Sequence, residues 1–332
     1  MTKTRTRAET AEDGGRHYDV VVVGGGAAGL SGALALSRAR RSVLVVDAGS
    51  PRNAPAANAH NYLAREGTPP SELLAAGREE VSGYGGEIAR DEVVTAERLD
   101  AGDFRVTLRD RPPVTAHRLL VTTGLVDELP QVTGLAERWG RDVLHCPYCH
   151  GWEVRDQPIA VLGDGPMAVH QALMWRQWSS RVTLLLHTAP EPGPEEYERL
   201  AARDIAVVKG KVDAVEVGDD RLTGVTLADG RTVPCRAVVV APYFAARSGV
   251  LADLGLEVTE QEMGGHVIGT FVASDPMGAT AAPGVWVAGN VTLLTETVIG
   301  AAAAGLRAAV AINSDLIDED TRRAVDARRD GR

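Results

Sequence analysis

Cysteine is scarce in this chain, with three residues in 332, and two of the three, Cys146 and Cys149, form a C-x-x-C pair. Structural disulfides are rare in a reducing cytosol, and a framework of them needs more cysteines than this. We therefore predict a cytoplasmic protein in which the pair is redox-active. We interpret the third cysteine, Cys235, which follows Pro234 near an apolar run, as a small buried hydrophobe.

Long apolar runs and an excess of positive charge are also missing. No uncharged apolar stretch reaches the roughly 18 residues of a bilayer-spanning helix, and Thr2–Gly15 has no apolar core of the kind found in secretory signals. The 35 Lys and Arg residues are outnumbered by 45 Asp and Glu residues, which gives a formal net charge of −10. Arginine is concentrated only in Thr2–Arg7 and Arg322–Arg332, which we interpret as solvated tails. We expect no nucleic-acid partner and no membrane partner.

Glycine, in contrast, is abundant, with 36 residues, many of them in short clusters. In a chain about two domains long, this pattern is typical of an α/β protein with tight strand-to-helix turns. The Val-rich run Tyr18–Val23 predicts a buried parallel strand, and Ala27–Arg40 predicts a helix. Ser42–Val46 predicts a second strand that ends at Asp47, so the three segments make a βαβ unit.

The turn of this unit has the form G-x-G-x-x-G and reads Gly24-Gly25-Gly26-Ala27-Ala28-Gly29. Gly24 permits the tight turn, Gly26 lets the backbone approach a pyrophosphate, and Gly29 lets the helix pack closely. Ala27 and Ala28 begin the helix, whose N-terminus suits phosphate charge. Asp47, about 20 residues further on, would bond the ribose hydroxyls. The turn therefore predicts a dinucleotide site.

A second unit of the same kind begins midway along the chain. Its strand, glycine turn, helix and strand are Ile159–Leu162, Gly163–Pro166, Met167–Trp178 and Val182–Leu186. The duplication predicts an α/β fold with two Rossmann-like dinucleotide-binding domains. The remaining pattern predicts helices at Ser71–Tyr84 and about Glu296–Ile317, and strands at Glu87–Ala96, Phe104–Leu108, Leu119–Thr123, Ala206–Val217, Leu222–Leu227, Ala237–Val240 and Val285–Ala288.

The second glycine turn is a candidate NAD(P)H site, because Gly163 to Ala168 has the form G-x-G-x-x-A. The support that NADP needs is missing: no arginine follows the strand Val182–Leu186, and Glu191 would repel a 2′-phosphate. His187 could partly replace an arginine. Two interpretations stand here, nicotinamide binding and a domain kept as a scaffold.

The cysteine pair lies between two histidines, in the run His145-Cys146-Pro147-Tyr148-Cys149-His150. A C-x-x-C at a turn into a helix lowers the pKa of one thiol, and His145 and His150 can take and return thiol protons. Haem attachment normally needs export, and zinc needs four well-separated ligands, so we predict no haem and no metal site here. An inert buried pair is the remaining alternative.

The order of these motifs resembles the low-molecular-weight thioredoxin reductase family. The resemblance runs from about Tyr18 to Ile317 and includes the strand end Thr122-Thr123-Gly124 and the run from Val285 to Asn290. It implies a homodimer and an FAD domain in two segments, residues 1–125 and 245–332. It also implies an inserted NAD(P)-type domain, residues 126–244, that carries the pair, with domains of the three-layer ββα type. Further FAD contacts are implied at Thr123, Gly124, Gly289 and Asn290.

The stretch from His145 to Glu153 is more similar to the dithiol oxidases of gliotoxin, holomycin and romidepsin biosynthesis, because His150 stands where thioredoxin reductases usually have an Asp. This similarity implies a small-molecule dithiol whose thiols are joined through the Cys146–Cys149 disulfide. It implies that Cys146 forms the mixed disulfide and that Cys149 is the thiol nearest the flavin. Electrons would pass through FAD to O2 and give hydrogen peroxide.

Three residues are candidates for proton transfer in this reaction: His145 first, His150 second, and Glu296 third. Glu296 is also readily explained as an ordinary acid at a helix start. Two other functions stay open, a thioredoxin-disulfide reductase that uses NAD(P)H or ferredoxin, and a non-catalytic flavin redox sensor. Three aromatic residues near the pair either line a pocket or belong to the core: Trp139, Tyr148 and Trp152.

Overall fold

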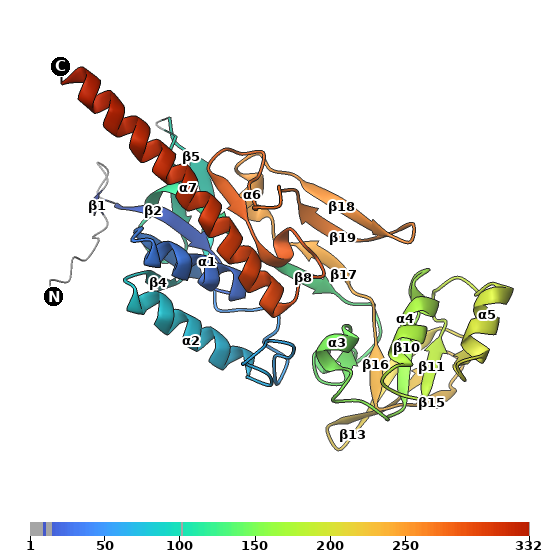
Figure 1. Cartoon of the computed structure of the whole chain (residues 1–332). Helices are drawn as coiled ribbons and strands as arrows, with labels where there is room; N and C mark the ends of the chain where they lie inside the picture. The colour runs from blue at the N-terminus through green and yellow to red at the C-terminus, as the bar shows by residue number, and fades with distance from the viewer. Residues whose placement is uncertain (1–8, 11–14, 101, 332) are drawn as a thin grey trace.

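The computed structural model describes residues 9–10, 15–100 and 102–331 and divides them between a larger and a smaller lobe (Figure 1). The arginine-rich segment Thr2–Arg7 lies outside the described residues. The predicted fold class is confirmed: both lobes contain a Rossmann-like parallel sheet, and the smaller lobe is inserted into the chain of the larger one.

The larger lobe is built on a parallel sheet with the strand order β4–β3–β2–β7–β20. These strands are β2 (Arg16–Val23), β3 (Val43–Asp47), β4 (Glu87–Arg90), β7 (Val114–Val121) and β20 (Val285–Val287). The short strand β1 (Glu9–Thr10) pairs with β2, and β5 (Val93–Arg98) and β6 (Phe104–Leu108) continue antiparallel from β7. The helices are α1 (Ala27–Arg38), α2 (Pro70–Gly83) and α7 (Val298–Asp330).

Strand β2 is buried on both faces, which explains its run of valines. Val20 and Val22 pack against the layer of α1, α2 and α7, whereas Val21 and Val23 pack against β5, β6 and the short helix α6 (Gly249–Ala252). Each valine removed from water stabilises the fold by about 1.5–3 kcal/mol. The alternation produces three layers, two of strands and one of helices.

The smaller lobe repeats the design with a parallel sheet of order β12–β11–β10–β16–β9 and a separate antiparallel sheet. The parallel strands are β9 (Val143–Leu144), β10 (Ile159–Leu162), β11 (Val182–Leu185), β12 (Ala206–Val208) and β16 (Ala237–Val239). The antiparallel strands are β13 (Val212–Gly218), β14 (Arg221–Leu227) and β15 (Thr232–Pro234). The helices are α3 (Pro147–His150), α4 (Ala168–Trp175) and α5 (Pro194–Ala201).

A third sheet lies where the chain passes between the lobes. The chain leaves the larger lobe through β8 (Leu125–Glu128) and returns through β17 (Tyr243–Ala246), and these two strands pair with each other. The hairpin of β18 (Val258–Met263) and β19 (His266–Val272) completes this sheet. The hairpin extends from the larger lobe toward α4 (Figure 1).

Several predicted elements have different bounds in the structure. The run Glu87–Ala96 was predicted as one strand, but buried Asp91 accepts hydrogen bonds from the backbones of Glu92 and Asp110 and divides the run into β4 and β5. Likewise, Gly210, with φ of +127°, divides the predicted strand Ala206–Val217 into β12 and β13. Strands β17, β18 and β19 were not predicted. The pairing of β17 with β8 and β19 joins segments distant in the sequence, whereas β18 and β19 form a local hairpin across Gly264-Gly265, a turn signal that was missed.

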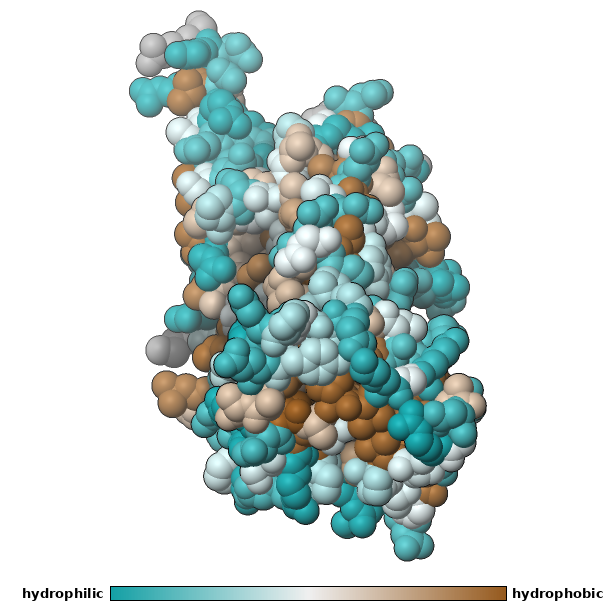
Figure 2. Space-filling view, turned by 90° about the vertical axis from the view of Figure 1, so that its right-hand side faces the viewer, coloured by the Kyte–Doolittle hydropathy of each residue, from teal (hydrophilic) through white to brown (hydrophobic). Residues whose placement is uncertain are grey.

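The segment Arg322–Arg332 is solvent-exposed over its described part, as predicted, but it is helical and not an irregular tail, because α7 continues to Asp330. Ion pairs with residues distant in the sequence stabilise this helix: Arg118 binds both Asp315 and Glu319, and Arg41 binds Asp320. Among the residues described, none of the helices, α7 included, combines the length and the apolar character required to cross a membrane. Viewed from the side of the smaller lobe, hydrophobic surface gathers in the lower half of the molecule, and most of the remaining face is hydrophilic (Figure 2).

Helices α1 and α7 touch backbone to backbone, so we expect Gly305→Ala to destabilise the protein. A Cβ on Gly305 would lie 1.9 Å from the carbonyl oxygen of Ala28. The helices would have to separate, at a cost of about 1–3 kcal/mol, which thermal unfolding would report as a lower midpoint. Gly83→Ala is the matched control, because Gly83 ends α2 with nothing within 4 Å of such a Cβ. Equal midpoints for the two variants would contradict the close contact.

Candidate active site

A cavity of about 1110 Å³ connects the first glycine turn to the cysteine pair. It opens at the carboxyl ends of the parallel strands of the larger lobe, which is where α/β sheets bind ligands. Drug-sized pockets reach about 1,000 Å³, so this cavity is large enough for a dinucleotide. All the predicted site residues except Gly29 line it: Gly24, Gly26, Ala27, Ala28, Asp47, Thr123, Gly124, His145, Cys146, Cys149, His150, Gly289, Asn290 and Glu296.

The glycines of the first turn have different roles. Gly24 has a φ of +107°, and a Cβ there would lie 2.6 Å from the carbonyl oxygen of Thr122. A Cβ on Gly29 would lie 1.9 Å from the carbonyl oxygen of Gly24, so both glycines are required by the fold itself. Gly26 has nothing within 4 Å of its Cβ position and lines the cavity. Its backbone is therefore open to a ligand, as a pyrophosphate requires.

The neighbouring strand ends support this cradle. The Thr122 hydroxyl donates hydrogen bonds to the carbonyl oxygens of Val23 and Gly24, at 3.1 and 2.9 Å, and so ties β7 to the turn. Asp47 ends β3 beside the turn, and its carboxylate accepts a hydrogen bond of 3.1 Å from the Gly49 backbone. The first turn of α1 contains no acidic residue. This arrangement fits FAD, with its phosphates at the start of α1 and a ribose near Asp47.

Two predicted cofactor contacts use their side chains within the protein. The Thr123 hydroxyl donates to the Arg247 carbonyl oxygen at 2.6 Å. The Asn290 amide donates to the carbonyl oxygens of Leu293, Leu294 and Glu296, at 3.1–3.2 Å. Asn290 thus organises the loop before α7, and we expect it to meet a cofactor through its backbone.

Cys146 and Cys149 are joined in a disulfide, with their Cα atoms 5.2 Å apart. Cys146 precedes the first residue of α3, and its Sγ accepts a hydrogen bond of 3.2 Å from the Cys149 backbone N–H. This donor would stabilise negative charge on the Cys146 sulfur. Cys235, in contrast, is buried in the core of the smaller lobe, where burial raises its pKa to about 12, so the prediction of a small buried residue is confirmed.

His145 is held in a defined tautomer. Its Nδ1 lies 3.1 Å from the carbonyl oxygen of Val240, which accepts only, so Nδ1 carries the hydrogen. Nε2 is therefore the basic atom. Burial lowers the pKa of His145, and the nearby Arg52 guanidinium acts in the same direction. The ring packs edge-on against Phe244, with centroids 5.1 Å apart. His145 is consequently a neutral base at neutral pH.

His150 lies on the other side of the pair and is also mostly neutral, because burial lowers its pKa against the opposing effect of Glu153. Glu153 is itself 3.3 Å from Nε2 of His60. The adjacent Asn61 donates a hydrogen bond of 2.6 Å to the carbonyl oxygen of Tyr148, between the cysteines. The loop of the larger lobe thus holds the redox helix of the smaller lobe.

No function was predicted from the sequence for this loop, Ala48–Pro70. Its residues Arg52, His60 and Asn61 line the cavity, and Arg52 forms a two-bond ion pair with Asp127 and lies 5.2 Å from the Phe244 ring centre. Only a cluster of polar residues in a loop could have signalled this role.

Glu296 lies in the predicted place, but its carboxylate accepts a hydrogen bond from the Thr297 backbone at 3.2 Å, as a helix-start acid does.

Of the three aromatic residues near the pair, Trp139 and Tyr148 line the cavity. Tyr148 is 67% exposed and packs edge-on against Trp178, so it presents an aromatic face beside the cysteines. Trp152 is on the surface, where Arg155 covers its ring at 4.0 Å. Tyr148 therefore places an aromatic ring beside the disulfide, whereas Trp139 lines the cavity and packs against the core of the smaller lobe.

The second glycine turn is covered where the first is open. Gly165 occupies the position of Gly26 in its motif, but a Cβ on Gly165 would lie 3.4 Å from Nε2 of His266. A Cβ on Gly264, at the same hairpin tip, would lie 2.8 Å from the Met167 sulfur. The β18–β19 hairpin therefore takes the space through which a pyrophosphate would approach.

Two side chains considered for 2′-phosphate binding near this turn, Glu191 and His187, have partners within the protein. Glu191 is bound by Lys209 and Tyr197, so a lysine does lie there but is paired. His187 accepts a hydrogen bond of 3.0 Å from the Val212 backbone, and burial lowers its pKa. A neutral, occupied histidine is a poor substitute for an arginine.

Comparison with known proteins agrees with this geometry. A family model described as pyridine nucleotide-disulphide oxidoreductase matches residues 18–309. The protein named thioredoxin reductase aclD of Aspergillus oryzae is 30% identical over 315 residues, which cover 90% of this chain and 96% of aclD. The crystal structure of HlmI has a TM-score of 0.86 at 46% identity and covers 97% of this chain and 98% of HlmI. Putative thioredoxin reductase TrxB from Bacillus anthracis has a TM-score of 0.84 at 28% identity, with 91% and 99% covered. The resemblance predicted from the motifs is confirmed.

The open position of Gly26 yields a test of the cradle. We expect Gly26→Ala to fold normally but to lose most of its FAD, because the added methyl group meets only the cofactor. The ratio of flavin to protein absorbance measures the loss, and circular dichroism checks the fold. Gly83→Ala, in open space and away from the cavity, should keep its FAD. Full FAD content in Gly26→Ala would show that the phosphates bind elsewhere.

Proposed function

Because this chain belongs to the pyridine nucleotide-disulphide oxidoreductase family and is an FAD-binding oxidoreductase, we propose that it is a dithiol oxidase. In this proposal it closes an intramolecular disulfide in a small-molecule dithiol and uses O2 as final acceptor. The observation that carries the proposal is the contrast between the glycine turns. The first opens into the cavity of the disulfide, whereas the second is covered by the hairpin.

The reaction begins with deprotonation of a substrate thiol by Nε2 of His145. The thiolate attacks Cys146, which breaks the disulfide and forms a mixed disulfide, while the Cys149 sulfur takes the electron pair. The substrate's second thiolate then attacks its own linked sulfur and expels Cys146. The backbone N–H of Cys149, 3.2 Å from the Cys146 sulfur, makes Cys146 a good leaving group. His150 accepts the second proton.

The product leaves as a disulfide, and the enzyme keeps two electrons as a dithiol. The chemistry that FAD supplies when bound is acceptance of these two electrons from the Cys149 side and their transfer to O2, which leaves as hydrogen peroxide. The residues that would hold it are those of the first glycine turn, Asp47 and the strand ends at Thr122–Gly124 and Gly289. Tyr148 gives the substrate entrance an aromatic face, which suits a small aromatic dithiol.

The organisation of the protein is proposed with its function. We propose that residues 1–125 and 245–332 form the FAD domain and that residues 126–244 form the inserted domain; the strands β8 and β17, where the chain crosses, support these limits. We also propose a homodimer, which the resemblance implies, and a cytoplasmic location, which the scarcity of cysteine favours.

The first experiment mixes the yellow protein anaerobically with a small dithiol, with NADPH and with NADH, and records the flavin absorbance. We expect only the dithiol to bleach the flavin, because the β18–β19 hairpin lies against the second glycine turn at Gly165. Air should then restore the colour and produce one peroxide per disulfide. Rapid bleaching by either nicotinamide would identify a thioredoxin-type reductase instead, and no bleaching by any dithiol would favour a redox sensor.

The second experiment tests His145 as the base. Its pKa is lowered from the ordinary 6.5 by burial, so the neutral form persists at pH 6.5 and is lost only as the pH falls further. The acid limb of kcat/KM should therefore lie below pH 6.5. His145→Gln should lose about 10²–10⁴-fold in kcat/KM and lose this limb.

The matched control is His170→Gln, because His170 is exposed on α4 and does not line the cavity. We expect it to keep both rate and profile. An acid limb that survives in His145→Gln would assign the base to another group, with His150→Gln as the next variant to measure.

A further inference from the structure

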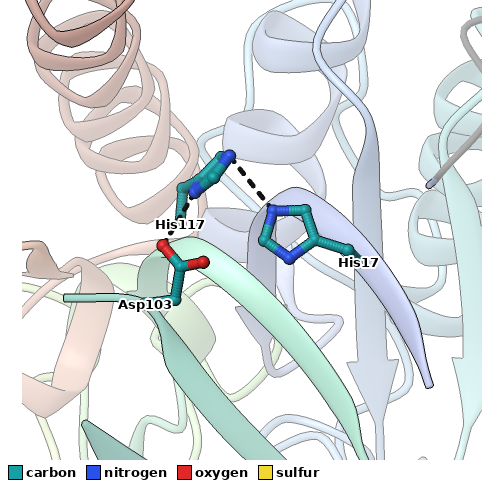
Figure 3. Close-up of side chains that lie close together, drawn as sticks. All are labelled: His17, Asp103 and His117. Atoms are coloured by element: carbon teal, nitrogen blue, oxygen red, sulfur yellow. Dashed lines mark hydrogen bonds and ion pairs between the residues drawn. The ribbon is translucent and has the colours of Figure 1, made fainter. Parts of the chain in front are cut away.

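A second cluster of titratable side chains lies outside the cavity, on the strands of the larger lobe. It consists of His17 on β2, His117 on β7 and Asp103 just before β6 (Figure 3). One ligand-type atom from each lies within 4.8 Å of the others. None of the three lines the active-site cavity. The proposed reaction therefore has no use for them.

The two rings face each other through their Nε2 atoms, which are 3.1 Å apart (Figure 3). Each ring also has a hydrogen-bond partner at its other nitrogen, Nδ1. Nδ1 of His117 lies 2.8 Å from a carboxylate oxygen of Asp103, and Nδ1 of His17 lies 2.9 Å from the hydroxyl of Thr115. Metal-binding histidines are usually oriented in this way, with the second ring nitrogen bonded to a carboxylate or another oxygen.

From this arrangement we infer that His17 and His117 bind a divalent transition-metal ion, such as zinc, between their Nε2 atoms. In a tetrahedral zinc site with Zn–N distances of about 2.05 Å, two nitrogens lie about 3.3 Å apart. The observed 3.1 Å needs little adjustment. Imidazole ligands select zinc, copper and nickel over magnesium and calcium. Asp103 positions His117 and makes it more basic, and water completes the coordination.

The hydrogens on the two histidine rings are set by the partners of the ring nitrogens. Without metal, one Nε2–H donates to the other Nε2, and the carboxylate of Asp103 keeps a hydrogen on Nδ1 of His117. His17 is then the donor at Nε2. Metal binding moves this hydrogen from Nε2 to Nδ1 of His17, where the Thr115 hydroxyl accepts it. Both imidazoles remain neutral, so this pair releases no hydrogen ion when the metal binds.

The metal would join two strands that are far apart in the sequence, since His17 on β2 and His117 on β7 are separated by 100 residues. The cluster lies where β2, β6 and β7 meet, beside β1, which pairs with β2. The ion would stabilise the folded larger lobe by linkage, since the unfolded chain does not bring these residues together. It would not change turnover.

The test uses the full-length protein with FAD bound and the cysteine pair oxidised, so that the thiols cannot bind zinc. After chelator treatment, equilibrium dialysis against Zn²⁺ and mass spectrometry measure the metal bound. We expect a single zinc ion per chain, with at least tenfold weaker binding in His17→Gln and His117→Gln. Asp103→Asn should weaken binding by about 10–100-fold. His170→Gln should bind zinc as the wild type does, and Mg²⁺ should not bind.

Thermal unfolding gives an independent measurement. Zinc should raise the midpoint of the wild type and of His170→Gln, but not that of His17→Gln or His117→Gln. FAD content in zinc-free buffer shows whether each variant folds, and if the histidine variants do not, Asp103→Asn decides the question. The inference is overturned if the wild type binds no zinc, or if the variants that keep FAD bind zinc as tightly as the wild type.

Discussion

The site depends on one contact, the place where the backbones of the glycine turn, α1 and α7 meet without side chains between them. Gly29 lies against the carbonyl oxygen of Gly24, and Gly305 lies against that of Ala28. The close approach sets the first turn of α1 at the carboxyl edge of the sheet, where its N–H groups reach the cavity. A methyl group at either glycine would separate the elements that shape the cofactor cradle.

The two glycine turns show how one motif acquires two different roles. Both follow a parallel strand, precede a helix and begin with the same G-x-G spacing. Gly26 faces an open cavity, whereas Gly165 faces His266 of a hairpin that belongs to the other lobe. In the proposed reaction the electrons come from the dithiol substrate, so no second nucleotide is needed.

Burial keeps the two histidines beside the disulfide neutral, so each can accept a proton. It lowers the pKa values of His145 and His150, and the Val240 carbonyl leaves Nε2 of His145 as the basic atom. Two neutral bases beside a disulfide suit a reaction that must remove two thiol protons. The loop that carries His60 and Asn61 places the redox helix against this cavity, so the site requires both lobes.

The sequence by itself determined the two βαβ units, the fold class, the cysteine pair and a set of site residues, all of which except Gly29 line the cavity. These features follow from local rules, because glycine turns, valine runs and the C-x-x-C spacing act within a few residues. Only the tertiary structure decided the break at Asp91, the length of α7, the loop contacts of Asn61, the cover over Gly165 and the meeting of His17 with His117. Each of these depends on a partner brought close by chain folding, since a hydrogen bond or ion pair acts through space and not along the sequence.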